Sequence, residues 1–410
     1  MTLRIALRVF LPFAFGFYLS YLYRSVNAII APDLIGEIGL DAASLDLLSS
    51  ADFISFAAFQ IPLGIILDRV GPRKVEAALL IIAALGAGIF ASSDTLANLI
   101  IGRSFIGLGV SACLMASFKS FVDWFPKEHL PLSNGAIMMA GGLGALTATA
   151  PIELVLEFTD WRGIFWILAA LTLISSIMIY SIVPERSIER KIVGDTTLRE
   201  QISGLLEVIS NPLFQRYVPI SVTSQGSMLA LQSLWMGPWL RGDVGGLTRT
   251  ETASSLLIMA VALACGFLSW GIIGERLGRY GISPMKISLL GVAVFLIIQL
   301  VIIFEPLSFI LPILFLFGFF GTAGSLSYVG LIQNFPNHLS GRVFTTANLL
   351  IFLVAFLGQW GIGLIIDLWP QASEGHFSQI GYQVAFAVVL FVQIISFSWV
   401  GISKLLWPQI

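Results

Sequence analysis

The sequence predicts an all-α integral membrane protein with twelve transmembrane helices in two pseudo-symmetric six-helix bundles. Apolar residues make up 57% of the 410 residues, charged residues only 11%, and the mean hydropathy is +0.92. A soluble domain carries about 25% charged residues, so this chain has too few to cover a water-exposed surface. The run from Gly64 to Gly71 (GIILDRVG) returns 207 residues later as the run from Gly271 to Gly278 (GIIGERLG). A repeat at half the chain length indicates two homologous halves.

Twelve apolar segments of about 20 residues, the length that crosses a bilayer, can be placed along the chain. They are residues 9–31, 44–66, 74–92, 96–120, 131–156, 161–183, 213–240, 252–273, 284–304, 307–334, 342–367 and 379–403. The first could pass for a signal peptide, because Arg4 and Arg8 precede it. It continues without a convincing cleavage site, so we expect it to be the first transmembrane helix.

The longest polar stretch, residues 184–212, divides these segments six and six. Within it, apolar residues fall at helical spacing, which predicts an amphipathic helix along the membrane surface. The predicted organisation is an N-terminal bundle (1–183), a cytoplasmic linker (184–212) and a C-terminal bundle (213–410).

The basic residues predict the orientation. If both termini are cytoplasmic, all Lys and Arg lie on that side except for five. These are Arg162, Arg241 and Arg249 on the opposite side, and Arg24 and Arg103 within spans. This bias agrees with the positive-inside rule and favours a multi-pass protein of the cytoplasmic (inner) membrane with both termini inside. The net charge of −2 gives no reason to expect a nucleic-acid partner; the expected partners are the lipid bilayer and small molecules, and we expect a monomer.

The repeated loop resembles the signature of the major facilitator superfamily between helices 2 and 3. The residues that carry the resemblance are Gly64, Asp68, Arg69, Gly71 and Arg73 in the first half, with Gly271, Glu275, Arg276, Gly278 and Arg279 in the second. Pro72 stands where the family often has a basic residue. Arg103 and Gly107 resemble the helix-4 motif, and Asp160-Trp161-Arg162 resembles the usual start of helix 6.

The resemblance implies that the repeated loop latches the outward-facing state. Asp68 would then lie near the start of helix 11 and Arg73 near Asp123, and Glu275 and Arg276 would act similarly in the second half. The alternative is that these residues only anchor the topology by the positive-inside bias.

Arg24 is the first candidate for contact with a substrate, because a charge inside the bilayer is costly and marks a functional site. At 1.5 Å per residue it lies about 22 Å along the first span. Ser20, Tyr21, Arg24 and Asn27 share one helical face. The surrounding segment also resembles the anion:cation symporter branch of the superfamily, in which an arginine at this place holds the carboxylate or phosphate of the substrate. The alternative is an arginine permanently paired with a buried acid.

Asp52 is the best candidate for that acid. The turn between the first two spans is centred near Ile38, and Arg24 and Asp52 lie 14 residues to either side. They are therefore expected at similar depth. An anion that competes for Arg24 would free Asp52 to take a proton, which is a route to proton coupling. Arg103 could pair with Asp52 instead, and the pair could be purely structural.

The second half offers neutral polar candidates. Ser221, Gln225, Met228, Gln232 and Trp235 step by four, three, four and three along the seventh span, on one predicted face. Tyr328 in the tenth span and Asn348 in the eleventh are further candidates. The alternative is that the glutamines and the tryptophan join helices to one another.

Three functional classes can be compared. The first is a secondary transporter that moves a small organic anion by alternating access, with proton symport. The second is an exporter of a metabolite or drug by proton antiport, although the Gly-Pro-x-x-Gly-Gly pattern usual in helix 5 of such antiporters is missing. The third is a polytopic membrane enzyme. The sequence contains no metal-ligand spacing or nucleophile–base motif that would support it, and His129, His338 and His376 all fall in predicted loops. We therefore expect no enzyme activity, no cofactor and no metal site.

Overall fold

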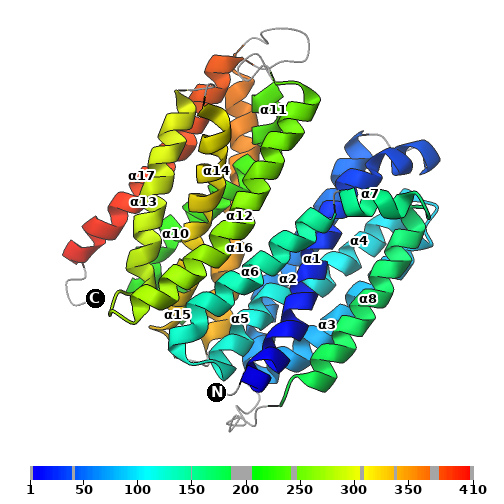
Figure 1. Cartoon of the computed structure of the whole chain (residues 1–410), viewed down its shortest axis with the longest axis horizontal. Coiled ribbons are helices and arrows are strands. Elements are labelled where there is room, and N and C mark those ends of the chain that lie inside the picture. The colour runs from blue at the N-terminus through cyan, green and yellow to red at the C-terminus, as the bar shows by residue number, and fades with distance from the viewer. Residues whose placement is uncertain are drawn as a thin grey trace. The chain divides into compact units, whose positions relative to one another are not determined.

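A computed structural model describes residues 3–38, 42–148, 150–185, 206–241, 247–304, 309–336, 339–369 and 378–406. In these residues every regular element is a helix (Figure 1). The chain divides into two compact units, unit 1 (Met1–Leu205 with Phe335–Thr346) and unit 2 (Leu206–Asn334 with Ala347–Ile410). The predicted amphipathic linker helix falls largely on residues 186–205, which lie outside the described part of the chain.

The helices of unit 1 follow the predicted spans, with differences in length and continuity. They are α1 (Leu3–Ile38), α2 (Ala42–Val70), α3 (Pro72–Ala91), α4 (Leu96–Val110), α5 (Cys113–Trp124), α6 (Leu130–Thr147), α7 (Ala150–Leu156) and α8 (Trp161–Ile182). The predicted span 96–120 is two helices, because the chain makes a turn at Ser111 and Ala112 between α4 and α5.

Local sequence signals explain several of these boundaries. Gly71 adopts a φ of 90°, which favours glycine, and Pro72 follows in the first turn of α3. The side chain of Thr95 caps α4, and that of Asp160 caps α8 by accepting a hydrogen bond from the backbone N–H of Gly163.

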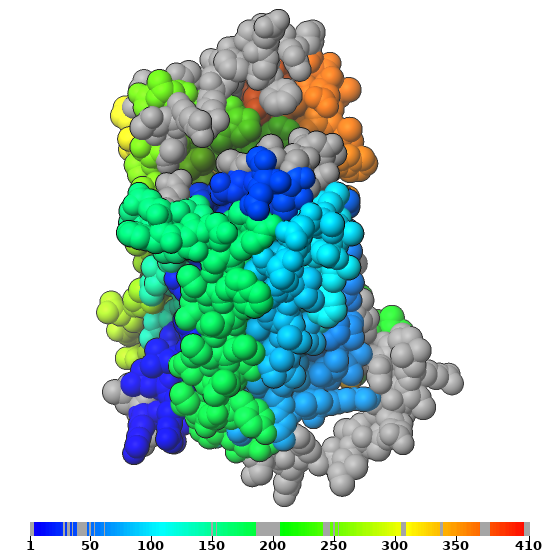
Figure 2. Space-filling model, turned by 90° about the vertical axis from the view of Figure 1, so that its right-hand side faces the viewer, coloured from blue at the N-terminus to red at the C-terminus, as the bar shows by residue number. Residues whose placement is uncertain are grey.

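Unit 1 is held together by close packing of α3 against α4 and α8. Glycines permit the approach: a Cβ on Gly86 would lie 2.7 Å from a backbone atom of Ile106, and one on Gly102 would lie 2.8 Å from a backbone atom of Phe90. Figure 2 faces this side, with green α8 beside the blue and cyan residues of α3 and α4. The outward side chains of α8 are large and apolar, among them Trp166, Ile174 and Ile177, as expected for a surface that faces lipid.

Unit 2 contains two interrupted helices. Its elements are α10 (Pro212–Ala230), a π-helical turn (Leu231–Trp235), α11 (Met236–Arg241), α12 (Arg249–Gly278), α13 (Pro284–Ile303), α14 (Ile310–Gly321), a 3-10 turn (Thr322–Ser325), α15 (Leu326–Ile332), α16 (Ser340–Ile366) and α17 (Gln379–Leu406). The first seven residues of α16 belong to unit 1. An aromatic cluster fills the core, with Trp235, Trp239, Phe295, Tyr382 and Phe386 among its buried members.

Nine helices among the described residues are long and apolar enough to cross a membrane. The predicted spans 131–156 and 213–240 fall on interrupted helices, and the predicted span 44–66 falls on the continuous helix α2, which is not among the nine. An all-helical multi-pass membrane fold is therefore confirmed, whereas the number of twelve crossings stays a prediction.

Candidate functional site

Asp68 lies where the resemblance placed it, at the first turn of α16. Its carboxylate accepts hydrogen bonds from the backbone N–H groups of Gly341 (3.0 Å) and Arg342 (3.3 Å). A helix N-terminus favours a negative charge, so this contact is electrostatically matched. Gly64 makes the approach possible, because a Cβ there would lie 3.1 Å from the Cα of Arg342.

Lys119, which is not among the candidates predicted from the sequence, completes this cluster. Its buried ammonium lies 3.0 Å from the Asp68 carboxylate and donates to the hydroxyl of Ser340 at 2.7 Å. A buried acid and a buried base thus compensate each other at the end of α2. The signal in the sequence was a lysine within a predicted span, 96–120.

Arg73 has different neighbours from those expected. Its guanidinium donates to the backbone carbonyl of Tyr180 at the end of α8 and lies 3.6 Å from the carboxylate of Glu185. These are its contacts in place of Asp123, which is buried near the end of α5. Because Arg73 lies in the first turn of α3, which packs along α8, the end of α8 is the nearest acceptor.

The second copy of the motif is arranged differently. Glu275 is buried in the last turns of α12 and pairs with Arg279 at 2.7 Å, four residues further along the chain. Arg276 is exposed. Asp68 therefore bonds to a helix 273 residues away, and the described ion pair of Glu275 is with Arg279, directly after the end of α12.

Arg24 is half-buried on α1 and lies against aromatic rings. Its guanidinium carbon is 4.4 Å from the centre of the Phe56 ring on α2 and 5.6 Å from that of Tyr21. Such cation–π contacts orient the plane of the guanidinium. One turn further along, the side-chain carbonyl oxygen of Asn27 is buried without a hydrogen-bond partner among the described residues. Orphaned polar atoms beside a cation in a membrane span fit a ligand-binding surface.

Asp52 is buried on α2, with one carboxylate oxygen that has no hydrogen-bond partner in the described structure. Arg103 and Arg24 both attract it electrostatically. The similar depth expected for Arg24 and Asp52 agrees with this interaction. Which of the two arginines pairs with Asp52 stays a prediction.

Arg103 is fully buried on α4. It donates to the backbone carbonyl of Tyr23 at 3.1 Å, and its guanidinium lies 4.9 Å from the ring centre of Phe90 and 5.3 Å from that of Phe165. Gly107, one turn further along α4, lies directly against the backbone of Asp52. These contacts hold α4, α1 and α2 together around the acid.

In unit 2 the predicted polar face is broken by the π-helical turn from Leu231 to Trp235. The extra residue of a π turn rotates the residues after it, so the spacing counted from Ser221 does not continue to Trp235. The indole N–H of Trp235 donates to the carbonyl of Gln359 (3.1 Å), and the amide of Gln225 donates to the carbonyl of Gly324 (3.3 Å). Both donors join helices of unit 2, which supports the alternative interpretation for these two residues.

The other candidates of unit 2 lie on separate elements. Gln232 is half-buried in the π turn, while Tyr328 on α15 and Asn348 on α16 are buried. Their role stays a prediction.

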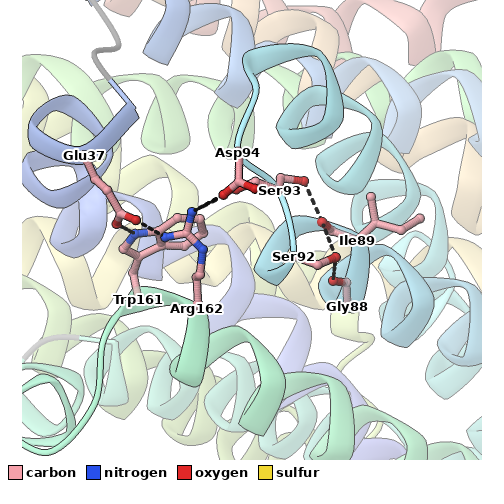
Figure 3. A network of polar contacts seen from close by, with 8 residues as sticks. All are labelled: Glu37, Gly88, Ile89, Ser92, Ser93, Asp94, Trp161 and Arg162. Atoms are coloured by element: carbon pink, nitrogen blue, oxygen red, sulfur yellow. Dashed lines mark hydrogen bonds and ion pairs between the residues drawn. The ribbon is translucent and has the colours of Figure 1, made fainter.

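A polar network joins the C-terminal end of α1, the residues that follow α3 and the first turn of α8 (Figure 3). Arg162 pairs with Glu37 and, at 2.8 Å, with Asp94, and the indole N–H of Trp161 donates to Glu37 at 2.7 Å. Arg162 also donates to the carbonyl of Ser93 at 3.1 Å. The motif Asp160-Trp161-Arg162 therefore caps α8 and ties it to two other helices, although its partners could not be read from the motif itself.

Glu76, like Lys119, is not among the candidates predicted from the sequence. It is fully buried in α3, and neither carboxylate oxygen has a hydrogen-bond partner among the described residues. An acid within the predicted span 74–92 was the available signal.

Comparisons with known proteins give the family and the fold. The family model described as Major Facilitator Superfamily matches residues 13–359. The crystal structure of the Escherichia coli fucose:proton symporter FucP superposes with a TM-score of 0.72, covering 95% of this chain and 99% of that one at 15% identity. At that identity the likeness shows the fold alone.

Curated relatives match parts of the chain. SauU of Cupriavidus necator, named as a probable sulfoacetate transporter, is 25% identical over 38% of this chain, and the hexuronate transporter of Escherichia coli is 24% identical over 39%. MdtD of Yersinia pestis, whose name assigns it to multidrug resistance, is 22% identical over 67%. The chain spans about a third of the first two relatives (36% and 37%) and about half of the third (52%).

Members of this family are transporters and not enzymes, in agreement with the prediction that the chain is not an enzyme. The match covers most of the chain and both units, and the helical fold agrees with it. The chain belongs to the Major Facilitator Superfamily.

Proposed function

We propose that this protein is a secondary active transporter that moves a small organic anion across the cytoplasmic membrane by alternating access, in symport with protons. Both termini would be cytoplasmic, and the protein would act as a monomer. The observation that carries the proposal is Arg24, a half-buried guanidinium in a membrane span, stacked on Phe56 and Tyr21. A guanidinium can recognise carboxylate, sulfonate or phosphate through two parallel hydrogen bonds.

The relatives support the choice of an anion. Two of them are named for sulfoacetate and for hexuronate, which carry sulfonate or carboxylate groups. The neutral candidates Gln232, Tyr328 and Asn348 would hydrogen-bond the uncharged part of the substrate. Asp52 would carry the coupling proton, and Asp68, Arg69 and Arg73 would latch one conformation.

Uptake into proteoliposomes tests the proposal. The probes are labelled sulfoacetate and D-glucuronate, with the inorganic anion nitrate for comparison, each measured with and without an inward proton gradient. We expect the gradient to drive accumulation of at least one of the two organic anions. Arg24→Ala should raise KM about 30-fold, since a charged hydrogen-bonded contact contributes about 2 kcal/mol. The control is Arg8→Ala near the start of α1, whose side chain is exposed; equal affinities in the two variants would contradict the anion site.

Asp52→Asn separates coupling from binding. Without an ionisable acid, gradient-driven accumulation should be lost while anion exchange down a concentration gradient persists. Normal accumulation by this variant would rule out Asp52 as the proton carrier.

Proton antiport of a drug-like compound is a second candidate, because the match to MdtD covers more of the chain than the other two matches. The same vesicles distinguish the two directions. An inward proton gradient that drives export of a preloaded drug-like compound, with no response to the three anions, would favour the exporter.

A further inference from the structure

Glu76 has a setting unlike that of any other described acid in unit 1. It is 0% exposed, and both carboxyl oxygens lack a hydrogen-bond partner among the described residues. It is the fifth residue of α3, so it lies about 6 Å along that helix from Pro72. On the orientation proposed above, it lies toward the cytoplasmic end of the bundle.

The neighbours of the carboxyl are small and uncharged. A Cβ on Gly16 of α1 would lie 2.6 Å from Oε1 of Glu76 and 3.4 Å from the hydroxyl oxygen of Ser175 on α8. That hydroxyl is also buried without a partner among the described residues. The thiol of Cys113, the first residue of α5, interacts with the carboxyl. Three helices thus surround the acid with a glycine, a hydroxyl and a thiol.

The cations near α3 are engaged by other groups. Arg73 and Lys74 on the same helix pair with Glu185. On the helices that pack against α3, Arg103 of α4 is attracted to Asp52 and Lys119 of α5 pairs with Asp68.

The remaining charged groups on the surrounding helices lie elsewhere. On α2, Arg69 is exposed, and on α8, Arg162 pairs with Glu37 and Asp94. Asp123 is near the end of α5 and Tyr180 near the end of α8, against Arg73. Arg24 of α1 acts on the Cys113 thiol. Arg4 and Arg8 of α1 are exposed. Among the described titratable groups, Cys113 is the one that interacts with the carboxyl.

A bare carboxylate in such a place would be very costly. Burying an ion without a counter-ion or hydrogen bonds costs several kcal/mol, and a group in that position takes up a proton instead. A protonated carboxyl fills the same space as the carboxylate but carries no charge, so it avoids this cost. The surroundings of Glu76 therefore favour binding of a proton.

We propose that Glu76 is a proton-binding site of the transporter, distinct from Asp52, which holds its proton in the conformation described here and releases it when water reaches the carboxyl from the cytoplasmic side. On release, the O–H bond of the carboxyl breaks, the proton passes to water, and the carboxylate left behind is hydrated. The link to transport rests on the proton-coupled function proposed above, whereas the presence of the proton rests on the geometry alone.

Infrared spectroscopy of the full-length protein in lipid nanodiscs tests the proton directly. The wild type at pH 7 should show the C=O stretch of a buried protonated carboxyl. Glu76→Gln should remove this band and Asp52→Asn should leave it. If Glu76→Gln does not fold, Glu76→Asp should shift the band. A wild-type spectrum without such a band would overturn the proposal.

Transfer to heavy water tests release. A carboxyl that lets its proton go shifts its C=O band as deuterium replaces hydrogen. We expect exchange on the timescale of transport. A band that stays unshifted through many turnovers would show a permanently sequestered proton and overturn the proposal.

Transport measurements distinguish a role of Glu76 in proton coupling from a purely structural role. With the three anions named above, Glu76→Gln should lose at least tenfold of its gradient-driven accumulation while anion exchange stays within twofold of the wild type. Accumulation equal to the wild type would make Glu76 a structural acid. If the wild type itself accumulates none of the anions, the proposed function fails, and the two infrared measurements then decide the proton site by themselves.

Discussion

Asp52 and Glu76 are two buried carboxyls of the same unit with opposite surroundings. Asp52 lies among cations, attracted to Arg103 and to Arg24, whereas the titratable group described beside Glu76 is the uncharged thiol of Cys113. Both acids have an oxygen without a hydrogen-bond partner among the described residues, and both are at most 4% exposed. Burial is therefore alike, and the charge of the neighbouring helices differs. The comparison teaches that neighbouring cations offset part of the cost of charging a buried acid at Asp52, and that the described residues around Glu76 offer no such offset.

A glycine accompanies each acid. Gly107 of α4 lies against the backbone of Asp52, and Gly16 of α1 lies against the side-chain tip of Glu76. A methyl group added at Gly107 would meet a backbone atom, which cannot move aside, whereas one added at Gly16 would meet the tip of a side chain, which can. Substituting the two glycines should therefore affect stability to different degrees.

The largest expected effect comes from removing the cation beside Asp52. Arg103→Met removes the bond to the Tyr23 carbonyl, the contacts with two rings and the attraction to Asp52, and should lower the free energy of unfolding by about 3 kcal/mol. Unfolding by denaturant, followed by circular dichroism, measures it. Adding Asp52→Asn should recover part of the loss, because the acid no longer needs a counter-ion. No recovery in the double variant would mean that Asp52 is not compensated by Arg103.

The next effect comes from crowding the backbone of Asp52. Gly107→Ala places a methyl group against a carbonyl that cannot rotate away, so we expect a loss of about 2 kcal/mol. The matched control is Gly401→Ala on α17, where nothing lies within 4 Å of the new Cβ. That variant should be neutral or slightly more stable, since alanine favours a helix. Equal stability of the two variants would contradict the close α2–α4 contact.

A smaller effect is expected at the corresponding glycine beside Glu76. In Gly16→Ala the new methyl group meets Oε1 at 2.6 Å, and a side-chain tip can move aside, so the loss should be about 1 kcal/mol. The C=O band of Glu76 should shift as its surroundings change. An unchanged band together with unchanged stability would place the carboxyl away from α1.

The smallest effect is expected for the thiol. A thiol is a weak hydrogen-bond donor, so Cys113→Ala should change the free energy of unfolding by less than about 0.5 kcal/mol and leave Glu76 protonated. Thermal unfolding and the infrared band measure the two quantities. Loss of the band in this variant would mean that the thiol, and not the lack of a cation, holds the proton in place.

The duplicated motif shows which contacts a sequence resemblance can predict and which it cannot. Its two copies read almost alike, yet Asp68 binds the N-terminus of α16 and Glu275 pairs with Arg279 directly after the end of its own helix. The resemblance correctly placed Asp68 but not Arg73, whose contacts lie at the end of α8. Spacing within a motif fixes which residues are near one another along a helix. It does not determine which other helix packs against the motif.

Hydropathy, periodicity and a repeat were enough to predict the membrane fold and the family and to select Arg24 and Asp52 as candidates, because these are local properties of the chain. They could not predict that Arg103 also attracts Asp52, that a π turn rotates Trp235, or that Glu76 is enclosed without a counter-ion among the described residues. The physical reason is that a buried charge is governed by the groups within a few ångströms of it, and packing brings those groups from helices far apart in the chain.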